Sequence, residues 1–307
     1  MNVSSSSIGA NWFLDGVAQL QRQEAATQRQ ISSGYRIQDA SDSPSQTPEL
    51  IALGSALATT QAYQTNLGRV QAETTSADSA LSSAITLIES ARTLALQGAG
   101  STATATDRQN LAAQAQSIQQ QLLSISNTTT EGRYIFGGDQ DLSPPYQANP
   151  AAASGVDQLT AQSATRVITD PSGQVVFQAA TASTIFDHRD ATGAALPDNA
   201  FAALQSLTLA LQNNDPAGAA TALTSLENVS TWLNQQQAAY GVAGSRISAE
   251  QTDAASQITN LTARISSIRD TDIVQAATDL ARESTAQAAA FAAQAEIPHK
   301  SLFDYLG

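Results

Sequence analysis

Two histidines are the first residues to test for chemistry, because the chain contains no cysteine. His188 lies between Asp187 and Arg189, and a carboxylate beside an imidazole is half of a general acid–base pair. Adjacent residues seldom face each other, so we interpret this segment as a solvated loop rather than a catalytic site. His299 follows a proline near the end of the chain and is interpreted as part of a linker. We therefore expect no catalytic residue and no cofactor.

Paired carboxylates are the remaining candidates for ligand chemistry. Asp39 and Asp42 lie close together, as do Asp270 and Asp272, and such clusters can bind a metal ion. Both pairs flank a predicted break between helices, where carboxylates more often cap helix ends. The sequence also lacks GxGxxG, GxxxxGK[ST], HExxH and GxSxG motifs. We expect no metal site.

Composition limits the possible partners. The 307 residues carry a net charge of −13, which argues against binding nucleic acid, since that requires a basic surface. No run approaches the ~20 apolar residues of a membrane span, so we expect no membrane insertion. The first 16 residues contain no basic or apolar segment typical of a secretory signal. Aromatic residues make up only 5%, which favours long, thin helical packing over a thick core.

The elements that dominate the sequence are two proline-free stretches, 49–143 and 217–297. Thr47-Pro48 predicts a helix over 48–97 with Thr47 as N-cap, and an uncharged heptad seam runs along it from Leu53 to Ala91. Thr106 and Gln109 fit a capping box for a second helix, closed by Gly132. Asp215-Pro216 starts a third helix, whose seam continues to residue 268. We expect these long helices to pack side by side and antiparallel.

The middle of the chain differs from the helical stretches. Val167–Thr169 and Val175–Phe177 flank the turn sequence Asp-Pro-Ser-Gly, which predicts strand, turn and strand. A helix with one apolar face is predicted over 198–213. The predicted fold is mainly α with a smaller β-rich insertion, built on a long antiparallel helical rod that resembles a coiled-coil bundle. Its five predicted segments are an N-terminal assembly helix region (1–42), the first part of the rod (43–137), the β-rich outer domain (138–197), the second part of the rod (198–271) and a C-terminal assembly helix region (272–307).

The two ends of the chain carry thin heptad stripes that cannot be buried by either end alone. The N-terminal stripe contains Phe13, Val17, Leu20 and Ile31, and the C-terminal stripe contains Ile273, Ala277, Leu280 and Phe291. We expect the ends to become ordered against each other and against neighbouring subunits.

Four short motifs resemble the flagellin superfamily, and together they extend over most of the chain. They are ISSGYRI at 31–37 with ASDSP at 40–44, QAYQTN at 61–66, GRYIFGG at 132–138 and SLFDYL at 301–306. The last two are similar to the hook-associated protein 3 family, the hook–filament junction proteins, and flagellins usually lack them. Ser43 stands where the superfamily usually has a second aspartate. The resemblance adds Leu302, Phe303 and Leu306 to the candidate assembly residues.

The resemblance implies a structural, flagellin-like subunit of the bacterial flagellum. Such proteins are exported without a cleavable signal peptide through the flagellar type III route, with a flagellar export chaperone covering the C-terminal region. They form a ring of identical subunits between the first hook-associated protein and the flagellin filament, outside the cell. Three alternatives remain: a flagellin that polymerises into the filament itself, an enzyme carried on the inserted domain, and a general coiled-coil binding protein with ends ordered on their own.

Overall fold

The computed structural model describes residues 5–160 and 166–296, and its chain divides into two compact units. Unit 1 combines residues 1–61 with 256–307, and unit 2 holds residues 62–255. Helices α2 (Thr47–Ala99) and α6 (Pro216–Arg269) each contribute residues to both units. The five segments predicted from the sequence are a finer division, which this partition does not test.

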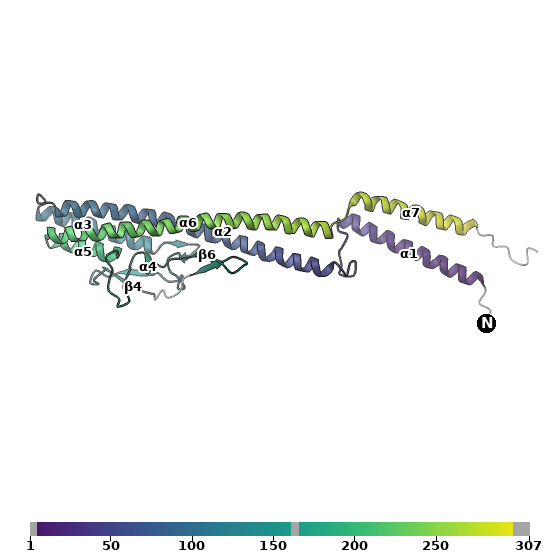
Figure 1. The fold of residues 1–307 in the computed structure, drawn as a ribbon, viewed down its shortest axis with the longest axis horizontal. Helices are drawn as coiled ribbons and strands as arrows, with labels where there is room; N and C mark the ends of the chain where they lie inside the picture. Colours follow the sequence, from purple (N-terminus) through teal and green to yellow (C-terminus); the bar gives the residue numbers. More distant parts are fainter. Residues whose placement is uncertain (1–4, 161–165, 297–307) are drawn as a thin grey trace, which may run out of the picture. The chain divides into compact units, whose positions relative to one another are not determined.

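In unit 2, α2 and α6 lie side by side and antiparallel (Figure 1). Ser230 donates a hydrogen bond to Glu89 over 2.7 Å, and Arg92 donates to Glu227 over 3.3 Å. The predicted seam is buried, and its fully enclosed members include Leu81, Ala84, Ile88 and Ala91. The prediction of long antiparallel helices is confirmed. When two such helices pair, their apolar side chains at heptad spacing become buried in the interface between them.

Two helix starts differ from prediction, and one agrees with it. Thr47 is the first residue of α2 rather than its N-cap, and its hydroxyl donates to the Ser43 carbonyl over 2.8 Å. Helix α3 (Ala105–Ser126) is capped by Thr104, which forms a capping box with Asp107, so the predicted start at Thr106 is wrong. At α6 the predicted cap is correct, because the Asp215 carboxylate accepts hydrogen bonds from two backbone amides of the first turn.

Helix α5 (Ala200–Gln212) packs against α3 and confirms the helix predicted over 198–213. Its apolar face is completely buried, and Asn199 caps it by accepting from the Ala202 amide over 2.9 Å. Arg108 of α3, itself 6% exposed, donates to the carbonyls of Gly98 and Gly100 and to the side chain of Asn214. This single buried guanidinium therefore joins the end of α2 to the α5–α6 connection.

Within the described ranges 5–160 and 166–296, the β structure consists of three antiparallel pairs, each with two strands. They are β1 (Thr129–Thr130) with β2 (Arg133–Tyr134), β3 (Tyr146–Ala148) with β4 (Val156–Gln158), and β5 (Val167–Thr169) with β6 (Val175–Gln178). The β5–β6 pair confirms the predicted strand–turn–strand. Gly132 lies in the β1–β2 turn with φ +76°, so it does not close α3, which ends at Ser126. A short helix, α4 (Ala182–Ile185), follows β6.

Two tyrosines of unit 2, the half-buried Tyr63 and the buried Tyr240, have raised pKa values. Burial, together with the nearby Glu250 carboxylate, raises the pKa of Tyr63 to about 12, and burial raises the pKa of Tyr240 to about 12. The hydroxyl of Tyr240 accepts a hydrogen bond from the Ala180 amide over 3.2 Å. Because the folded pKa values exceed those of an unfolded chain, the neutral tyrosines stabilise the fold below about pH 10 and this contribution is lost as the pH rises toward 12.

We expect the free energy of unfolding to fall between about pH 10 and pH 12, by roughly 2–3 kcal/mol from Tyr240 alone. Burial and the nearby Asp187 carboxylate also raise the pKa of Tyr146, so this tyrosine contributes to the loss over the same interval. Urea denaturation followed by circular dichroism across this pH range would measure the loss. A Tyr63→Phe, Tyr240→Phe variant should lose less stability than the unmodified protein over the same interval, with the remaining loss due to Tyr146, and an equal loss would contradict the assignment.

Candidate assembly surface

The helices at the two ends of the chain, α1 (Ser5–Ser33) and α7 (Ile273–Glu296), pack against each other in unit 1. The rings of Phe13 and Phe291 meet edge to face with their centroids 6.5 Å apart. Further along, Thr27 donates a hydrogen bond to Glu283 over 3.2 Å. The early residue of α1 meets a late residue of α7, so the pair is antiparallel.

The seam between α1 and α7 is thin and contains polar groups. Val17 and Ala276 are buried at 8% and 6% exposure, and Thr27 is also buried. Leu20, Ile31 and Leu280 are only half-buried. A polar pair inside such a seam favours one register over others, at a cost in stability. The described part of this pair therefore buries little apolar surface for its length.

The predicted C-terminal stripe is partly out of phase with the structure. Ala276 is buried, whereas the predicted Ala277 and Ile273 are exposed. Alanine-rich helices present similar small side chains on every face, so alanine spacing alone fixes the phase weakly. The predicted residues Leu302, Phe303 and Leu306 lie outside the described residues.

Large apolar side chains also point to solvent from both helices. Trp12 and Val274 are each 78% exposed, Leu14 is 63% exposed, and half of Phe291 remains accessible. The heptad analysis missed Trp12, Leu14 and Val274 because it followed a single face of each helix. The sequence signal that could have identified them is a bulky apolar residue that lies outside the heptad seam. Exposed apolar surface of this kind marks sites of association.

The segment that carries the ISSGYRI and ASDSP motifs joins α1 to α2 and contacts the end of α6. Gly34 has φ +75°, a conformation that favours glycine, and its carbonyl accepts from the Thr271 amide. Arg36 donates to the Ile268 carbonyl, and the Arg269 guanidinium lies 4.0 Å from the centre of the Tyr35 ring. These contacts position the start of α7 next to the end of α1.

The aspartates at the helix breaks accept backbone hydrogen bonds. Asp42 accepts from the Gln38 and Asp39 amides, each over 2.9 Å, and these bonds hold its pKa below the usual value. Asp272 accepts from two amides in the first turn of α7. The capping interpretation is confirmed for Asp272, whereas Asp42 binds amides of the loop between α1 and α2 and does not cap a helix. Within residues 5–160 and 166–296, no three acidic or histidine side chains form a group suited to a metal ion.

The segment around His188 is more ordered than the predicted solvated loop. The His188 ring stacks on Trp232 at 4.8 Å between centroids, and its Nδ1 lies 3.0 Å from Asp198. Asp187 is 3% exposed and accepts hydrogen bonds from other side chains, namely Tyr146, Arg189 and Asn199. The adjacent carboxylate and imidazole therefore have different partners and do not form an acid–base pair.

Two family models match the chain and place it in a class of proteins. The bacterial flagellin N-terminal helical region matches residues 5–141, and the bacterial flagellin C-terminal helical region matches residues 223–306. These regions contain α1 to β2 and most of α6 with α7, so they include the candidate assembly surface. The chain belongs to the flagellin superfamily.

Within this superfamily the chain is similar to flagellar hook-associated protein 3. The Escherichia coli K12 protein is 28% identical over 188 residues, 60% of this chain and 58% of that protein. The Salmonella typhimurium LT2 protein is 27% identical over 176 residues, 56% of each chain. The aligned part thus spans little more than half the length of either relative.

Solved structures share the fold. A putative flagellar hook-associated protein from Vibrio parahaemolyticus superposes with a TM-score of 0.63 at 18% identity, covering 75% of this chain and 100% of that one. FlgL of Bacillus cereus superposes with a TM-score of 0.56 at 17% identity, covering 70% and 99%. Among the described residues, no helix is long and apolar enough to cross a bilayer.

We expect Val17→Asp to disrupt the pairing of α1 and α7 in the isolated protein, because it places a charge in the buried seam. Amide hydrogen exchange should show protection in α7 reduced by at least about tenfold, equivalent to ~1.4 kcal/mol. The matched control Trp12→Asp changes a side chain that is 78% exposed and should leave this protection unchanged. Unchanged protection in Val17→Asp would contradict the observed seam.

Proposed function

We propose that this protein is a structural subunit of the bacterial flagellum and forms the junction between the hook and the flagellin filament. The observation that carries the proposal is the pair α1–α7, which leaves Trp12, Leu14 and Val274 exposed after the two helices have packed. Similarity to hook-associated protein 3 in two organisms supports the same conclusion. Additional copies of such a helix pair would cover these apolar side chains.

The thin seam gives a physical reason for assembly. Isolated amphipathic helices are marginal in water, and α1 and α7 bury few large side chains against each other. Contacts with neighbouring subunits would supply the missing apolar burial. The subunit would then gain its full order in the assembled ring, while a free chain remains loose enough to be exported.

The proposed partners follow from this position in the flagellum. They are other copies of the chain in a ring, the first hook-associated protein on one side and flagellin on the other. A flagellar export chaperone would cover the C-terminal region before export, which would proceed through the type III route without a cleavable signal peptide. The protein would act outside the cell. It would be a structural protein rather than an enzyme, and its carboxylates Asp187 and Asp272 are held in an ion pair and a helix cap.

We expect deletion of residues 273–307 to abolish incorporation into flagella while leaving unit 2 folded. The deletion removes α7, and the core of unit 2 lies within residues 62–255. Immunoelectron microscopy of isolated flagella would locate the protein, and flagellin released unattached into the medium would report loss of the junction. Incorporation of the truncated chain would overturn the proposal.

We also expect Trp12→Asp to reduce incorporation by at least about tenfold without altering the isolated subunit, because a charge would then face the apolar contact between subunits. Gln114→Leu, an exposed position of α3 in unit 2, serves as a control that should assemble normally. Purified protein that polymerises into long filaments without a hook would instead identify a flagellin.

A further inference from the structure

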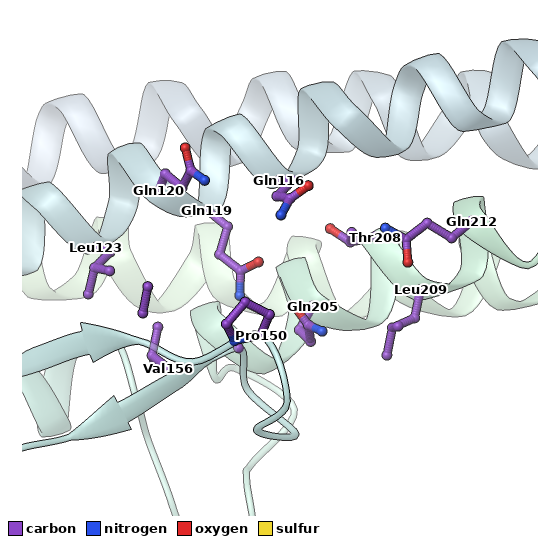
Figure 2. Close-up of a pocket in the computed structure, with 12 residues that line it drawn as sticks. Gln116, Gln119, Gln120, Leu123, Pro150, Val156, Gln205, Thr208, Leu209 and Gln212 are labelled. Carbon is purple, nitrogen blue, oxygen red and sulfur yellow. The ribbon is translucent and has the colours of Figure 1, made fainter.

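A small cavity in unit 2 lies between α3, α5 and the loop that joins β3 to β4 (Figure 2). Its volume is about 140 Å³. Figure 2 shows glutamine side chains entering it from both helices, with Pro150 and Val156 on the side of the strands. The cavity is distant in sequence from the terminal helices, and the proposed assembly role does not use it.

Two amide side chains in this cavity are more than nine-tenths buried. Gln119 is 7% exposed, and its amide nitrogen donates to the Ser154 carbonyl over 2.9 Å. Its Oε1 receives no hydrogen bond from any described residue. Gln205 is 8% exposed, and its side chain makes no hydrogen bond within the described part of the chain. The cavity therefore offers one unused acceptor from Gln119, and both a donor and an acceptor from Gln205.

Gly155 makes room for the two amides. It has φ +71°, and a Cβ there would lie 2.1 Å from the Gln119 Nε2 atom and 2.7 Å from the Gln205 Oε1 atom. Contacts that short do not occur, so any side chain at this position would displace both amides. The bare backbone of Gly155 keeps the two polar groups together at the cavity wall.

The cavity wall carries no charged side chain among its lining residues. Gln116, Gln120 and Gln212 add further neutral amides, while Leu123 and Leu209 supply apolar surface. A charged ligand would lose its hydration without gaining a partner of opposite charge. The chemistry of this wall matches an uncharged group that presents a donor and an acceptor next to a small aliphatic part.

We propose that this cavity binds a secondary amide, with its C=O and N–H paired to the Gln205 and Gln119 side chains and its aliphatic substituent against the leucines. Such an amide is found in an N-acetylated sugar and in a peptide unit, and both present a methyl or similarly small group beside it. The polar atoms of the Gln205 side chain still reach solvent, so a ligand amide would replace water as their hydrogen-bond partner. The bound amide would form hydrogen bonds with the Gln205 side chain and with Gln119 Oε1, which no described residue makes.

The test is a titration of the full-length, ¹⁵N-labelled protein, followed through its glutamine side-chain NH₂ resonances. The probes are N-acetylglucosamine, N-acetylalanine methylamide and glucose, which lacks the amide. We expect the Gln205 signals to shift with one or both amides and not with glucose, and the tighter amide identifies the source. No shift with either amide, or an equal shift with glucose, overturns the proposal.

Two variants separate binding from folding. Gln205→Leu removes the unpaired amide, so it should fold with an unchanged or higher melting temperature and should bind the preferred amide at least about tenfold more weakly. Gln114→Leu makes the same substitution at an exposed position of α3 outside the cavity and should bind normally. Equal affinity in Gln205→Leu and the unmodified protein would overturn the assignment.

Discussion

The pairing of helices from opposite ends of the chain is the interaction on which the other features depend. In unit 2, α2 and α6 bury a continuous seam of leucine, isoleucine and alanine, and in unit 1 the much thinner seam of α1 and α7 repeats this antiparallel arrangement. Both pairs are antiparallel, but the α2–α6 seam buries more apolar side chains than the α1–α7 seam. The α1–α7 pair buries few large side chains and leaves Trp12, Leu14 and Val274 exposed.

Aromatic residues are scarce, and their distribution explains how the β pairs remain stable. Each pair has only two strands, which are marginal in water without further packing. Phe136, Phe186 and Phe201 pack together, and Tyr146 contacts Phe201 with ring centroids 5.3 Å apart. The seam between the long helices is mostly aliphatic, and Tyr240 of α6 reaches the β structure through its ring contact with Phe177. The aromatic cluster gives these short elements a dense core.

The sequence predicted the elements whose signals are local and repeated. Heptad spacing, the proline gaps and the Asp-Pro-Ser-Gly turn were sufficient for the long helices and the β5–β6 pair. The start of α3 was wrong because Thr104–Asp107 and Thr106–Gln109 are overlapping capping boxes, and the charged, shorter aspartate forms the observed one. The sequence did not predict the stacking of His188 on Trp232, or the approach of the Gln119 and Gln205 amides to Gly155. Both involve residues that are distant in sequence, so no local pattern indicates them.

The Thr27–Glu283 hydrogen bond joins residues 256 positions apart, and this separation bears on the order of folding. Contacts between remote residues form slowly because a long loop must close first. Once α2 and α6 have paired, that loop is already closed, and Glu49 and Arg264 can approach to the observed 3.4 Å. Helices α1 and α7 then need to close only a short loop before they pair. A folding chain would thus pair its helices in sequence, from α2 and α6 toward α1 and α7.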